Sequence, residues 1–351
     1  MNIKQIHLVN YKNHQNLKLI FEKNVVCFVG LNGIGKTNIL DAIYYSCIGK
    51  SYFASVDKNC VNYDAQFFRL KTNFVDNEIV ITYEKGKRKK INLNEVPVTK
   101  LSNYLGNFPV VVIAPDDNIL ILGNSEDRRK FIDQTLMQTD KKYASVLVKY
   151  AKILQQRNAL LKNAEKQGLD LSLLEIYTEN LIPLGNEIFK ARKEFVAQLN
   201  IYFNKAYKEI SLEREVLSLE YVSALSNNSF EQLLKNCLNK DRILKRTTEG
   251  VHKDDLLFLM NDSKIKSFGS QGQQKTFLLA LKLAQYYYLK EKLNKATTFI
   301  IDDIFDKLDA DRSKSLIKFV CENLEQVFIS HTNKEMLEKS FKNFDFQLIN
   351  I

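Results

Sequence analysis

The stretch VVCFVGLNGIGKTNILDAIYYSCIG, residues 25–49, decides the fold. It consists of an apolar run predicted to be a strand, a glycine-rich loop at 30–37, and a segment with apolar residues at helical spacing. Glycines let the loop wrap closely around phosphate, and its N–H groups then point inward at a helix N-terminus, where the dipole favours anions. A chance match is the alternative. The order of strand, loop and helix favours a P-loop that binds a nucleotide.

The loop supplies the first half of the predicted site. Lys36 is expected to reach the β and γ phosphates and to be catalytic, and Thr37 is expected to offer its hydroxyl to Mg²⁺. The predicted ligands of the nucleotide here are Gly30, Leu31, Asn32, Gly33, Ile34, Gly35, Lys36, Thr37 and Asn38. ATP and Mg²⁺ are therefore the expected cofactors.

A second acidic segment lies near the other end of the chain, in ATTFIIDDIFDKLD at 296–309. The apolar run predicts a buried strand with Asp302 at its tip as a metal ligand and Asp303 beside it as a candidate base. A turn that ends the strand and caps a helix is the alternative. More than 260 residues separate this pair from Lys36, so we expect a whole domain to be inserted between them.

Two further motifs surround this acidic pair. Upstream, Ser270, Gly272 and Gln273 fit the pattern S-x-G-Q opening a helix, which would present N–H groups and a hydroxyl to the γ-phosphate held by another protomer. Downstream, Asp309 lies at the position of an ABC-style D-loop, and His331 follows a second short strand. A histidine there can contact the γ-phosphate or the attacking water, and we include it among the catalytic candidates.

The remaining patterns divide the chain. Period-two runs before residue 100 predict strands, helical spacing from about 126 to 210 predicts a helical hairpin or bundle, and the last hundred residues return to alternating helices and strands. The predicted fold class is α/β, an ABC-type P-loop ATPase head with a mixed sheet and flanking helices, split by a mainly helical arm. The predicted domains are 1–114 with the P-loop, 115–242 as the arm, and 243–351 with the signature motif, Walker B strand and histidine.

Composition limits the class of protein and its partners. The net charge of +10 makes a polyanion such as DNA a plausible partner, with a lysine-rich solvated surface as the alternative. Five scattered cysteines without metal-ligand spacing fit buried thiols in a reducing compartment. We see neither a secretory signal nor a run of eighteen apolar residues, so we expect a cytoplasmic protein with no membrane partner.

The order of these motifs resembles the ABC ATPase head of SMC-like proteins. Over essentially its whole length the chain resembles the bacterial RecF family, through the segments at 30–53, IAPDDNILILGNSEDRRKFID at 113–133, EGVHKDDL at 249–256 and FGSQGQQKT at 268–276. The resemblance implies a DNA-binding, slowly hydrolysing ATPase that forms a homodimer around two nucleotides. It also implies that RecO and RecR are partners in loading RecA at single-strand gaps of duplex DNA, within recombinational repair and the SOS response.

The chain departs from the family pattern at several positions. Ala114 stands where the glutamine of an ABC Q-loop is expected, so Asp116 or a water is a candidate for its role at the metal. Val251 and Lys253 stand where proline and arginine are expected. Asp303 is shorter than the glutamate of fast ABC ATPases, which fits slow turnover.

Two basic clusters are candidate DNA contacts. The first lies on a predicted hairpin and comprises Lys85, Lys87, Arg88, Lys89 and Lys90; a solvated edge that resists aggregation is the alternative. The second is Arg128 and Arg129 at the start of the helical segment, where local salt bridges are the alternative. Two other functions remain open: an ATPase subunit serving a membrane transporter, and a non-hydrolysing module in which nucleotide only sets shape.

Overall fold

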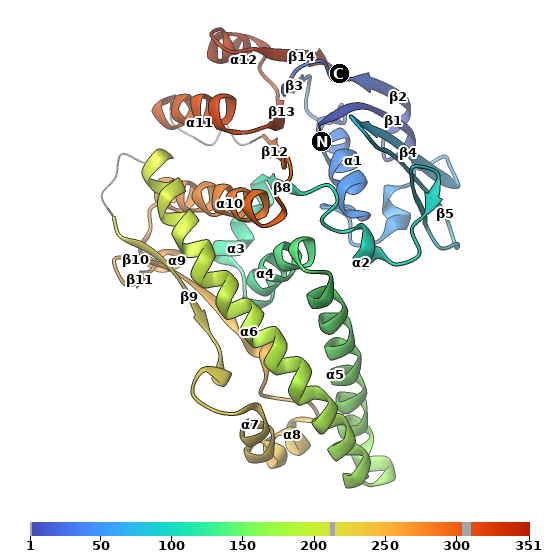
Figure 1. Ribbon diagram of the computed structural model, residues 1–351, viewed down its shortest axis with the longest axis vertical. Helices are drawn as coiled ribbons and strands as arrows, with labels where there is room; N and C mark the ends of the chain where they lie inside the picture. Colours follow the sequence, from blue (N-terminus) through green and yellow to red (C-terminus); the bar gives the residue numbers. More distant parts are fainter. Residues whose placement is uncertain (1, 211–214, 304–309) are drawn as a thin grey trace. The chain divides into compact units, whose positions relative to one another are not determined.

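The computed structural model describes residues 2–210, 215–303 and 310–351, and the chain forms two compact units (Figure 1). The first unit comprises Met1–Asn118, Lys205–Glu213 and Gln271–Ile351, and the second comprises Ile119–Asn204 and Arg214–Ser270. The two ends of the sequence therefore fold together, and the second unit is inserted between them along the chain.

A five-stranded sheet forms the core of the first unit, in the order β14-β3-β13-β12-β8 with every neighbouring pair parallel. Its strands are β3 (Val25–Val29), β8 (Val110–Ile113), β12 (Thr298–Asp302), β13 (Gln326–His331) and β14 (Phe346–Asn350). In β3, β8, β12 and β13 every residue is buried. Strands covered on both faces have continuous apolar sequences, which is why VVCFV and TTFII show no alternation.

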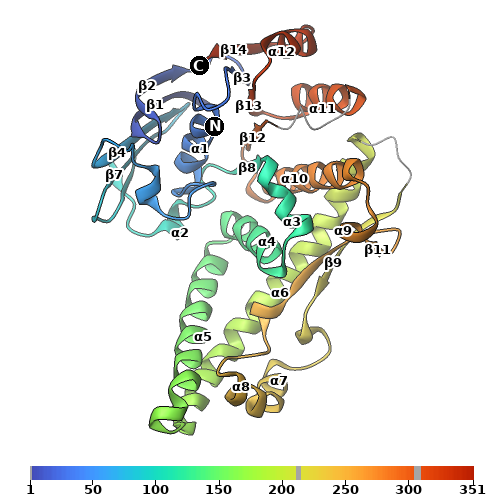
Figure 2. The same cartoon turned by 180° about the vertical axis from the view of Figure 1, so that it is seen from behind.

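A six-stranded antiparallel sheet completes the first unit, in the order β2-β1-β4-β5-β6-β7 (Figure 2). Its strands are β1 (Ile3–Tyr11), β2 (His14–Ile20), β4 (Phe67–Phe74), β5 (Glu78–Glu84), β6 (Lys90–Leu93) and β7 (Val96–Pro97). Burial alternates along β4 and most of β5, as expected for a sheet with one covered face.

Helix α1 (Lys36–Ile48) contacts strands of both sheets, β8, β12 and β13 on one side and β1, β4 and β5 on the other. Eleven of its residues are buried for this reason, although its sequence indicates a single apolar face with Ile39, Leu40, Ile43 and Cys47. The other helices of the unit are η1 (Asp57–Cys60), α2 (Leu101–Tyr104), η2 (Pro115–Asn118), α10 (Gln271–Leu293), α11 (Ala310–Asn323) and α12 (Lys334–Phe341).

The second unit is built on long helices. Its main helices are α4 (Ser125–Thr139), α5 (Lys141–Gln167) and α6 (Leu171–Ile210), the end of which belongs to the first unit. Asn124 and Asp127 form a capping box that begins α4, and Asp140 accepts hydrogen bonds from two backbone N–H groups that begin α5. Its shorter helices are α3 (Ile119–Leu122), η3 (Ala224–Ser226), α7 (Phe230–Asn236), α8 (Leu238–Leu244), η4 (Val251–Lys253) and α9 (Ile265–Phe268).

A three-stranded antiparallel sheet also belongs to the second unit. Strand β10 (Asp255–Met260) pairs with β9 (Leu217–Val222) and with β11 (Ser263–Lys264). Because of this pairing the second unit extends to Ser270, whereas the sequence places the end of the arm at 242. The arm is therefore not purely helical.

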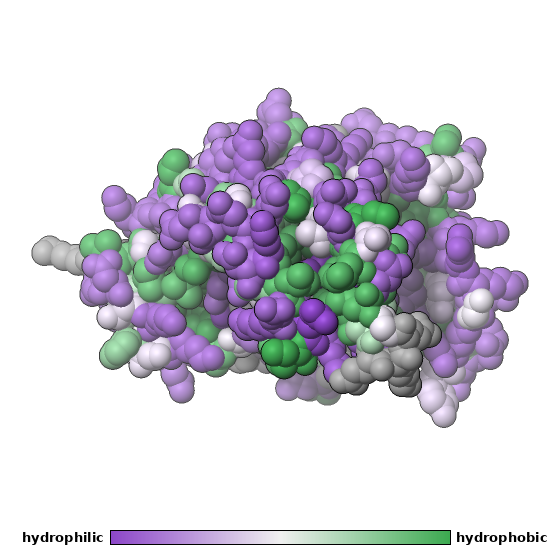
Figure 3. All heavy atoms as spheres, turned by 90° about the horizontal axis from the view of Figure 1, so that it is seen from below, coloured by the Kyte–Doolittle hydropathy of each residue, from purple (hydrophilic) through white to green (hydrophobic). Residues whose placement is uncertain are grey.

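Apolar side chains are visible at the surface, surrounded by polar ones, on the face drawn in Figure 3. Exposed apolar atoms are normal on a folded protein. Within the described ranges, none of the helices has both the length and the apolar character needed to cross a membrane.

Candidate functional site

The carboxyl ends of β3, β13 and β12 bring the two halves of the predicted site together. Ser330 on β13 pairs in register with Asp302 on one side and Phe28 on the other, and His331 pairs with Val29, the last residue before the glycine-rich loop. Ligands of open parallel sheets bind at the carboxyl ends of the strands. Sheet order alone therefore joins residues that lie at opposite ends of the sequence.

The glycine-rich loop wraps around the side chain of its own lysine. Lys36 Nζ donates hydrogen bonds to the carbonyl oxygens of Gly30 at 2.6 Å and Leu31 at 3.0 Å. Gly33 and Gly35 have φ angles of 81° and 113°, in the left-handed region that favours glycine. Lys36 is the first residue of α1, so the loop ends at the N-terminus of this helix, as a phosphate-binding loop requires.

Two residues that the sequence analysis missed contact the loop from the junction of β1 and β2. Asn13 Nδ2 donates to the Ile34 carbonyl at 2.7 Å, and His14 Nε2 donates to the Gly35 carbonyl at 3.1 Å. A Cβ atom on Gly35 would lie 2.5 Å from His14 Nε2, and the φ of 113° is a conformation that residues with a side chain rarely adopt, so glycine is favoured here. Burial lowers the pKa of His14. The short segment NYKNH carries no pattern that marks these residues in advance.

Thr37 and Asp302 are in direct contact. The Thr37 hydroxyl lies 3.0 Å from each carboxylate oxygen of Asp302, and Ser330 Oγ donates to Asp302 Oδ1 at 2.6 Å. Burial raises the pKa of Asp302, while the hydrogen bonds from Ser330 and Thr37 oppose this shift. Ser330 is a site residue that we did not predict, because its contact with Asp302 depends on β13 lying beside β12 in the sheet.

Asp303 lies next to His331. The Asp303 N–H donates to Ser330 Oγ at 3.0 Å, and His331 Nδ1 lies 3.8 Å from Asp303 Oδ1. Asp303 has a φ of 47°, a left-handed conformation that is uncommon for residues with a side chain and that aspartate and asparagine adopt more readily than most. The imidazole is fully buried and the carboxylate is 41% exposed, so the carboxylate is the member of this pair that solvent reaches.

A pocket of about 230 Å³ opens at this edge of the sheet. It is lined by Asn32, Gly33, Gly35, Lys36, Thr37, Asn38, Asp302, Asp303 and Ser330. Mg²⁺ prefers hard oxygen ligands and is usually held by one or two carboxylates together with substrate phosphates. The Thr37 hydroxyl and the buried Asp302 carboxylate fit that requirement, and the described residues contain no cluster of three or more acidic, histidine or cysteine side chains that would suit another metal.

The S-x-G-Q residues surround the N-terminus of α10. Ser270 directly precedes the helix and is exposed, and Gly272 and Gln273 lie in its first turn and are half-buried. None of the three is among the residues that line the P-loop pocket. Asp309, the predicted D-loop residue, lies outside the described residues.

The segment after β8 contains Asp116, the candidate for the role of the Q-loop glutamine, and its neighbour Asp117. Asp116 is exposed and is not among the residues lining the pocket. Asp117 is buried and forms an ion pair with Lys282 of α10, with Asp117 Oδ1 3.0 Å from Lys282 Nζ. The proposed role of Asp116 at the metal stays a prediction.

The basic hairpin joins β5 to β6, with Gly86 at a φ of 82° in its turn. Lys89 Nζ is 3.0 Å from Asp57 Oδ2 and 2.6 Å from the Gly49 carbonyl, and Lys85 Nζ donates to the Ala65 carbonyl at 2.7 Å. The exposed cations are Lys87, which pairs with Glu84, together with Arg88 and Lys90. Only part of the predicted cluster therefore faces solvent.

Arg128 and Arg129 have partners within the second unit. Arg128 forms a two-pronged ion pair with Asp255, with Nε to Oδ1 at 2.7 Å and Nη2 to Oδ2 at 3.0 Å. Arg129 Nη1 donates to the Asp254 carbonyl at 2.5 Å, and burial lowers its pKa. These contacts agree with local pairing, the alternative to DNA contact for these two arginines.

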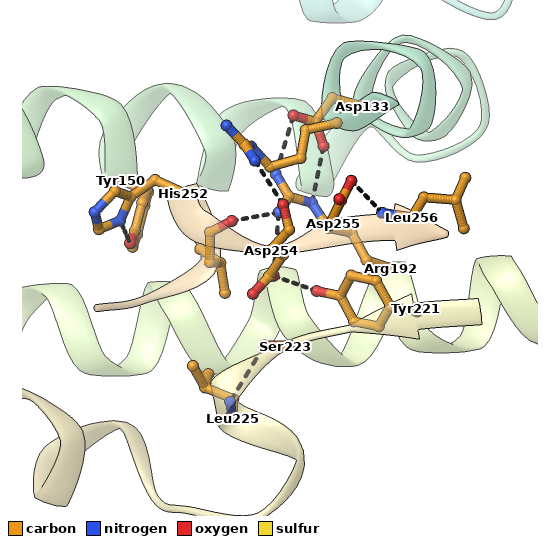
Figure 4. Close-up of polar contacts among 12 residues, drawn as sticks. Asp133, Tyr150, Arg192, Tyr221, Ser223, Leu225, His252, Asp254, Asp255 and Leu256 are labelled. Carbon is orange, nitrogen blue, oxygen red and sulfur yellow. Dashed lines mark hydrogen bonds and ion pairs between the residues drawn. The ribbon is translucent and has the colours of Figure 1, made fainter. Parts of the chain in front are cut away.

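The EGVHKDDL segment forms a buried polar network (Figure 4). Arg192 contacts Asp133 and Asp254, and the Tyr221 hydroxyl donates to Asp254. His252 Nε2 donates to the Thr247 carbonyl and its Nδ1 accepts from the Tyr150 hydroxyl, and burial lowers its pKa to about 4. Both ring nitrogens of His252 therefore have hydrogen-bond partners inside the arm.

Known proteins share this fold. A protein-family model described as "AAA domain" matches residues 5–345. A solved Smc head bound to the C-winged helix domain of ScpA has a TM-score of 0.56 and 16% identity, covering 99% of this chain and 93% of that chain, which shows the fold alone. The predicted fold class is confirmed: the class of protein is an ABC-type, SMC-like ATPase head with an inserted arm.

Closer relatives define the family. The protein "DNA replication and repair protein RecF" of Flavobacterium johnsoniae is 41% identical over 98% of this chain and 97% of its own length. Its namesake from Cytophaga hutchinsonii is 42% identical over 94% and 89%. A solved structure of the recombination mediator protein RecF-ATP in the RecFOR pathway has a TM-score of 0.88 and 30% identity, covering 95% of this chain and 92% of that chain. The chain belongs to the RecF family.

Proposed function

We propose that this chain is an ATP-dependent DNA-binding protein of recombinational and replication-gap repair, in which two copies dimerise on DNA around bound ATP and hydrolyse it slowly. One observation carries the proposal: Thr37 Oγ1 and Asp302, 265 residues apart in sequence, lie 3.0 Å apart beside the phosphate loop. The relatives named for replication and repair, and the RecF-ATP structure of the RecFOR pathway, support ATP and DNA as ligands. We extend the proposal to RecO and RecR as partners in loading RecA during the SOS response, in the cytoplasm.

Five of the residues that line the pocket have a specific role in this proposal. Lys36 binds the β and γ phosphates, Thr37 and Asp302 hold Mg²⁺, and Ser330 orients the Asp302 carboxylate through its 2.6 Å hydrogen bond. The metal neutralises phosphate charge when bound. Asp303 accepts a proton from the attacking water as general base, and His331 lies behind it.

The same geometry favours slow turnover. Asp303 has one methylene fewer than the glutamate of fast ABC ATPases, and its Oδ1 lies 3.8 Å from His331 Nδ1, beyond hydrogen-bond distance. The base is thus held loosely before nucleotide binds. Misplacement of a catalytic group by about 1 Å can lower a rate by roughly 100-fold.

Dimerisation accounts for the exposed S-x-G-Q turn. Ser270 is at the surface, and the residues lining the P-loop pocket do not include it, Gly272 or Gln273. We infer that these three contact the γ-phosphate bound by a second copy, so each nucleotide joins two subunits. A twofold pair of copies then contains two such sites.

The direct test of the proposal is the oligomeric state with different nucleotides. We expect light scattering after gel filtration to give a dimer with ATP and Mg²⁺ and a monomer with ADP, because only ATP carries the γ-phosphate that the second copy contacts. We expect duplex DNA with a single-strand gap to favour the dimer further. A monomer under all these conditions contradicts the proposal.

The variant Asp303→Asn separates ATP hydrolysis from dimerisation. It removes the proposed base while keeping the size of the side chain, so we expect the ATP dimer to persist for the length of the experiment while ATP turnover falls by roughly 100-fold or more. Wild-type turnover in this variant would exclude Asp303 as the base.

The hairpin prediction concerns the salt dependence of DNA binding. Replacing the exposed Lys87, Arg88 and Lys90 with glutamine is expected to flatten the plot of log affinity against log salt by about 0.9 for each lost phosphate contact. The control replaces three exposed lysines of α5, namely Lys149, Lys152 and Lys162, which removes the same net charge elsewhere. If both variants change the slope of log affinity against log salt equally, the hairpin does not contact DNA.

A further inference from the structure

Helix α10, which follows the S-x-G-Q serine, is buried on nearly all sides. Its buried residues run without a break from Thr276 to Tyr286 and continue with Tyr288 and Leu289. An amphipathic helix takes its rotation from a single apolar stripe. Because α10 has apolar residues all round, its hydrophobic pattern does not define which face contacts β8.

A buried ion pair lies in the middle of α10. Lys282 Nζ is 3.0 Å from Asp117 Oδ1 and 3.2 Å from the Tyr52 hydroxyl, and it lies 5.7 Å from the centre of the Tyr52 ring. The side chains of Lys282 and Asp117 are only 4% and 8% exposed. The Tyr52 hydroxyl donates to Asp117, so the three side chains contact one another in pairs.

This trio is attached to both halves of the nucleotide site. Asp117 Oδ2 accepts the Ala114 N–H at 2.8 Å, directly after β8, and β8 pairs in parallel with β12, the strand that ends at Asp302. The Tyr52 N–H donates to Asp41 Oδ1 at 2.8 Å, and Asp41 belongs to α1, which begins at Lys36. The pair therefore connects α10 to the elements that carry Lys36, Thr37 and Asp302.

We propose that Lys282 and Asp117 are positioning residues that set the rotation of α10, and with it the direction in which Gly272 and Gln273 face a second copy's nucleotide. Successive residues of a helix are rotated by about 100°, so a shift of α10 by one residue would rotate Gly272 and Gln273 away from the nucleotide of the second copy. Apolar contacts are not directional, whereas a buried ion pair is satisfied in one arrangement only. This inference rests on the proposed ATP-dependent dimer.

The experiment compares nucleotide binding with dimerisation in the double variant Lys282→Met/Asp117→Asn. Replacing both charges by neutral groups of similar size is often neutral for stability, whereas removing one leaves a buried uncompensated charge. We expect the double variant to bind ATP as a monomer within about twofold of the wild type, because it leaves the P-loop intact. We expect its ATP-dependent dimer to be at least about tenfold weaker, since about 1.4 kcal/mol corresponds to tenfold.

The controls separate positioning from folding. Lys282→Arg keeps the charge and is expected to dimerise within threefold of the wild type, and Tyr52→Phe removes one hydroxyl and is expected to weaken the dimer about threefold. If the double variant dimerises like the wild type, the inference is overturned and the proposed function stays intact. If the double variant does not fold, wild-type dimerisation of Tyr52→Phe has the same consequence. If the wild-type protein itself stays monomeric with ATP, the proposed function fails and the inference with it.

Discussion

Lys36→Ala is expected to lower the affinity for ATP by about tenfold to 150-fold. The reason is the loss of a charge-assisted contact with the phosphates, worth about 1.5–3 kcal/mol, at about 1.4 kcal/mol for each factor of ten. Lys36 Nζ lies within the loop, bound to the Gly30 and Leu31 carbonyls, and is 7% exposed. Bound phosphate oxygens would replace these carbonyls as its partners, so the ammonium group is already in place before nucleotide binds.

The loss of ATP affinity has a larger effect on dimerisation than on a single site. Two ATP molecules join two copies in the proposed assembly, so a defect in each site counts twice in the free energy of dimerisation. We therefore expect Lys36→Ala to remain monomeric at ATP concentrations that fully dimerise the wild type. Isothermal titration measures the affinity of the single site, and light scattering measures the oligomeric state.

Lys4→Ala is the control for this substitution. Lys4 is exposed on β1, and its removal changes the net charge by the same amount. We expect wild-type ATP affinity in this variant and an unchanged melting temperature in both. An ATP affinity of Lys36→Ala within threefold of the wild type would exclude the glycine-rich loop as the phosphate site.

The sequence indicates the candidate nucleotide site because each of its parts is a local pattern. A P-loop combines a strand, glycines and a helix N-terminus within 25 residues, and the strand before Asp302 is a continuous apolar run. The structure adds what no local pattern contains, namely that β13 lies between β3 and β12. Ser330 reaches Asp302 only because of that order, so a sequence without an alignment does not single it out.

The basic clusters show the opposite case. Arg128 and Arg129 have the charge that a phosphate contact needs, but the packing of α4 against β10 places Asp254 and Asp255 beside them. These aspartates are more than 120 residues away in sequence. Partners at such distances depend on tertiary structure, which the composition of a basic segment does not report.

Arg192→Met is the second substitution expected to have a large effect, this time on stability. Arg192 is 3% exposed, and its guanidinium contacts Asp133 through Nε at 3.0 Å and Nη2 at 3.1 Å, and Asp254 through Nη1 at 3.3 Å (Figure 4). It also donates to the Val251 carbonyl at 2.7 Å. Removing the cation leaves two carboxylates in the arm without their partner, which costs about 3–5 kcal/mol for a buried pair.

Urea unfolding followed by circular dichroism measures this loss. Lys190→Met is the matched control, because Lys190 is exposed on the same helix two residues away and its substitution is expected to change stability by less than about 0.5 kcal/mol. Equal unfolding midpoints for Arg192→Met and Lys190→Met would show that the network contributes nothing to the stability of the arm.

The dependence on pH distinguishes a lost charge from lost packing. Burial already raises the pKa of Asp254, and Arg192 opposes that shift, so the variant raises this pKa further. A carboxyl group with a folded-state pKa above its unfolded value costs stability once the pH exceeds that folded value, and this cost is absent below the unfolded pKa. The destabilisation by Arg192→Met should therefore be fully present at neutral pH and should shrink as the pH falls through the raised folded-state pKa of Asp254 towards the ordinary, unfolded-state value of an aspartate, about 4. Lost packing alone would give the same destabilisation at every pH, because methionine has no titratable group.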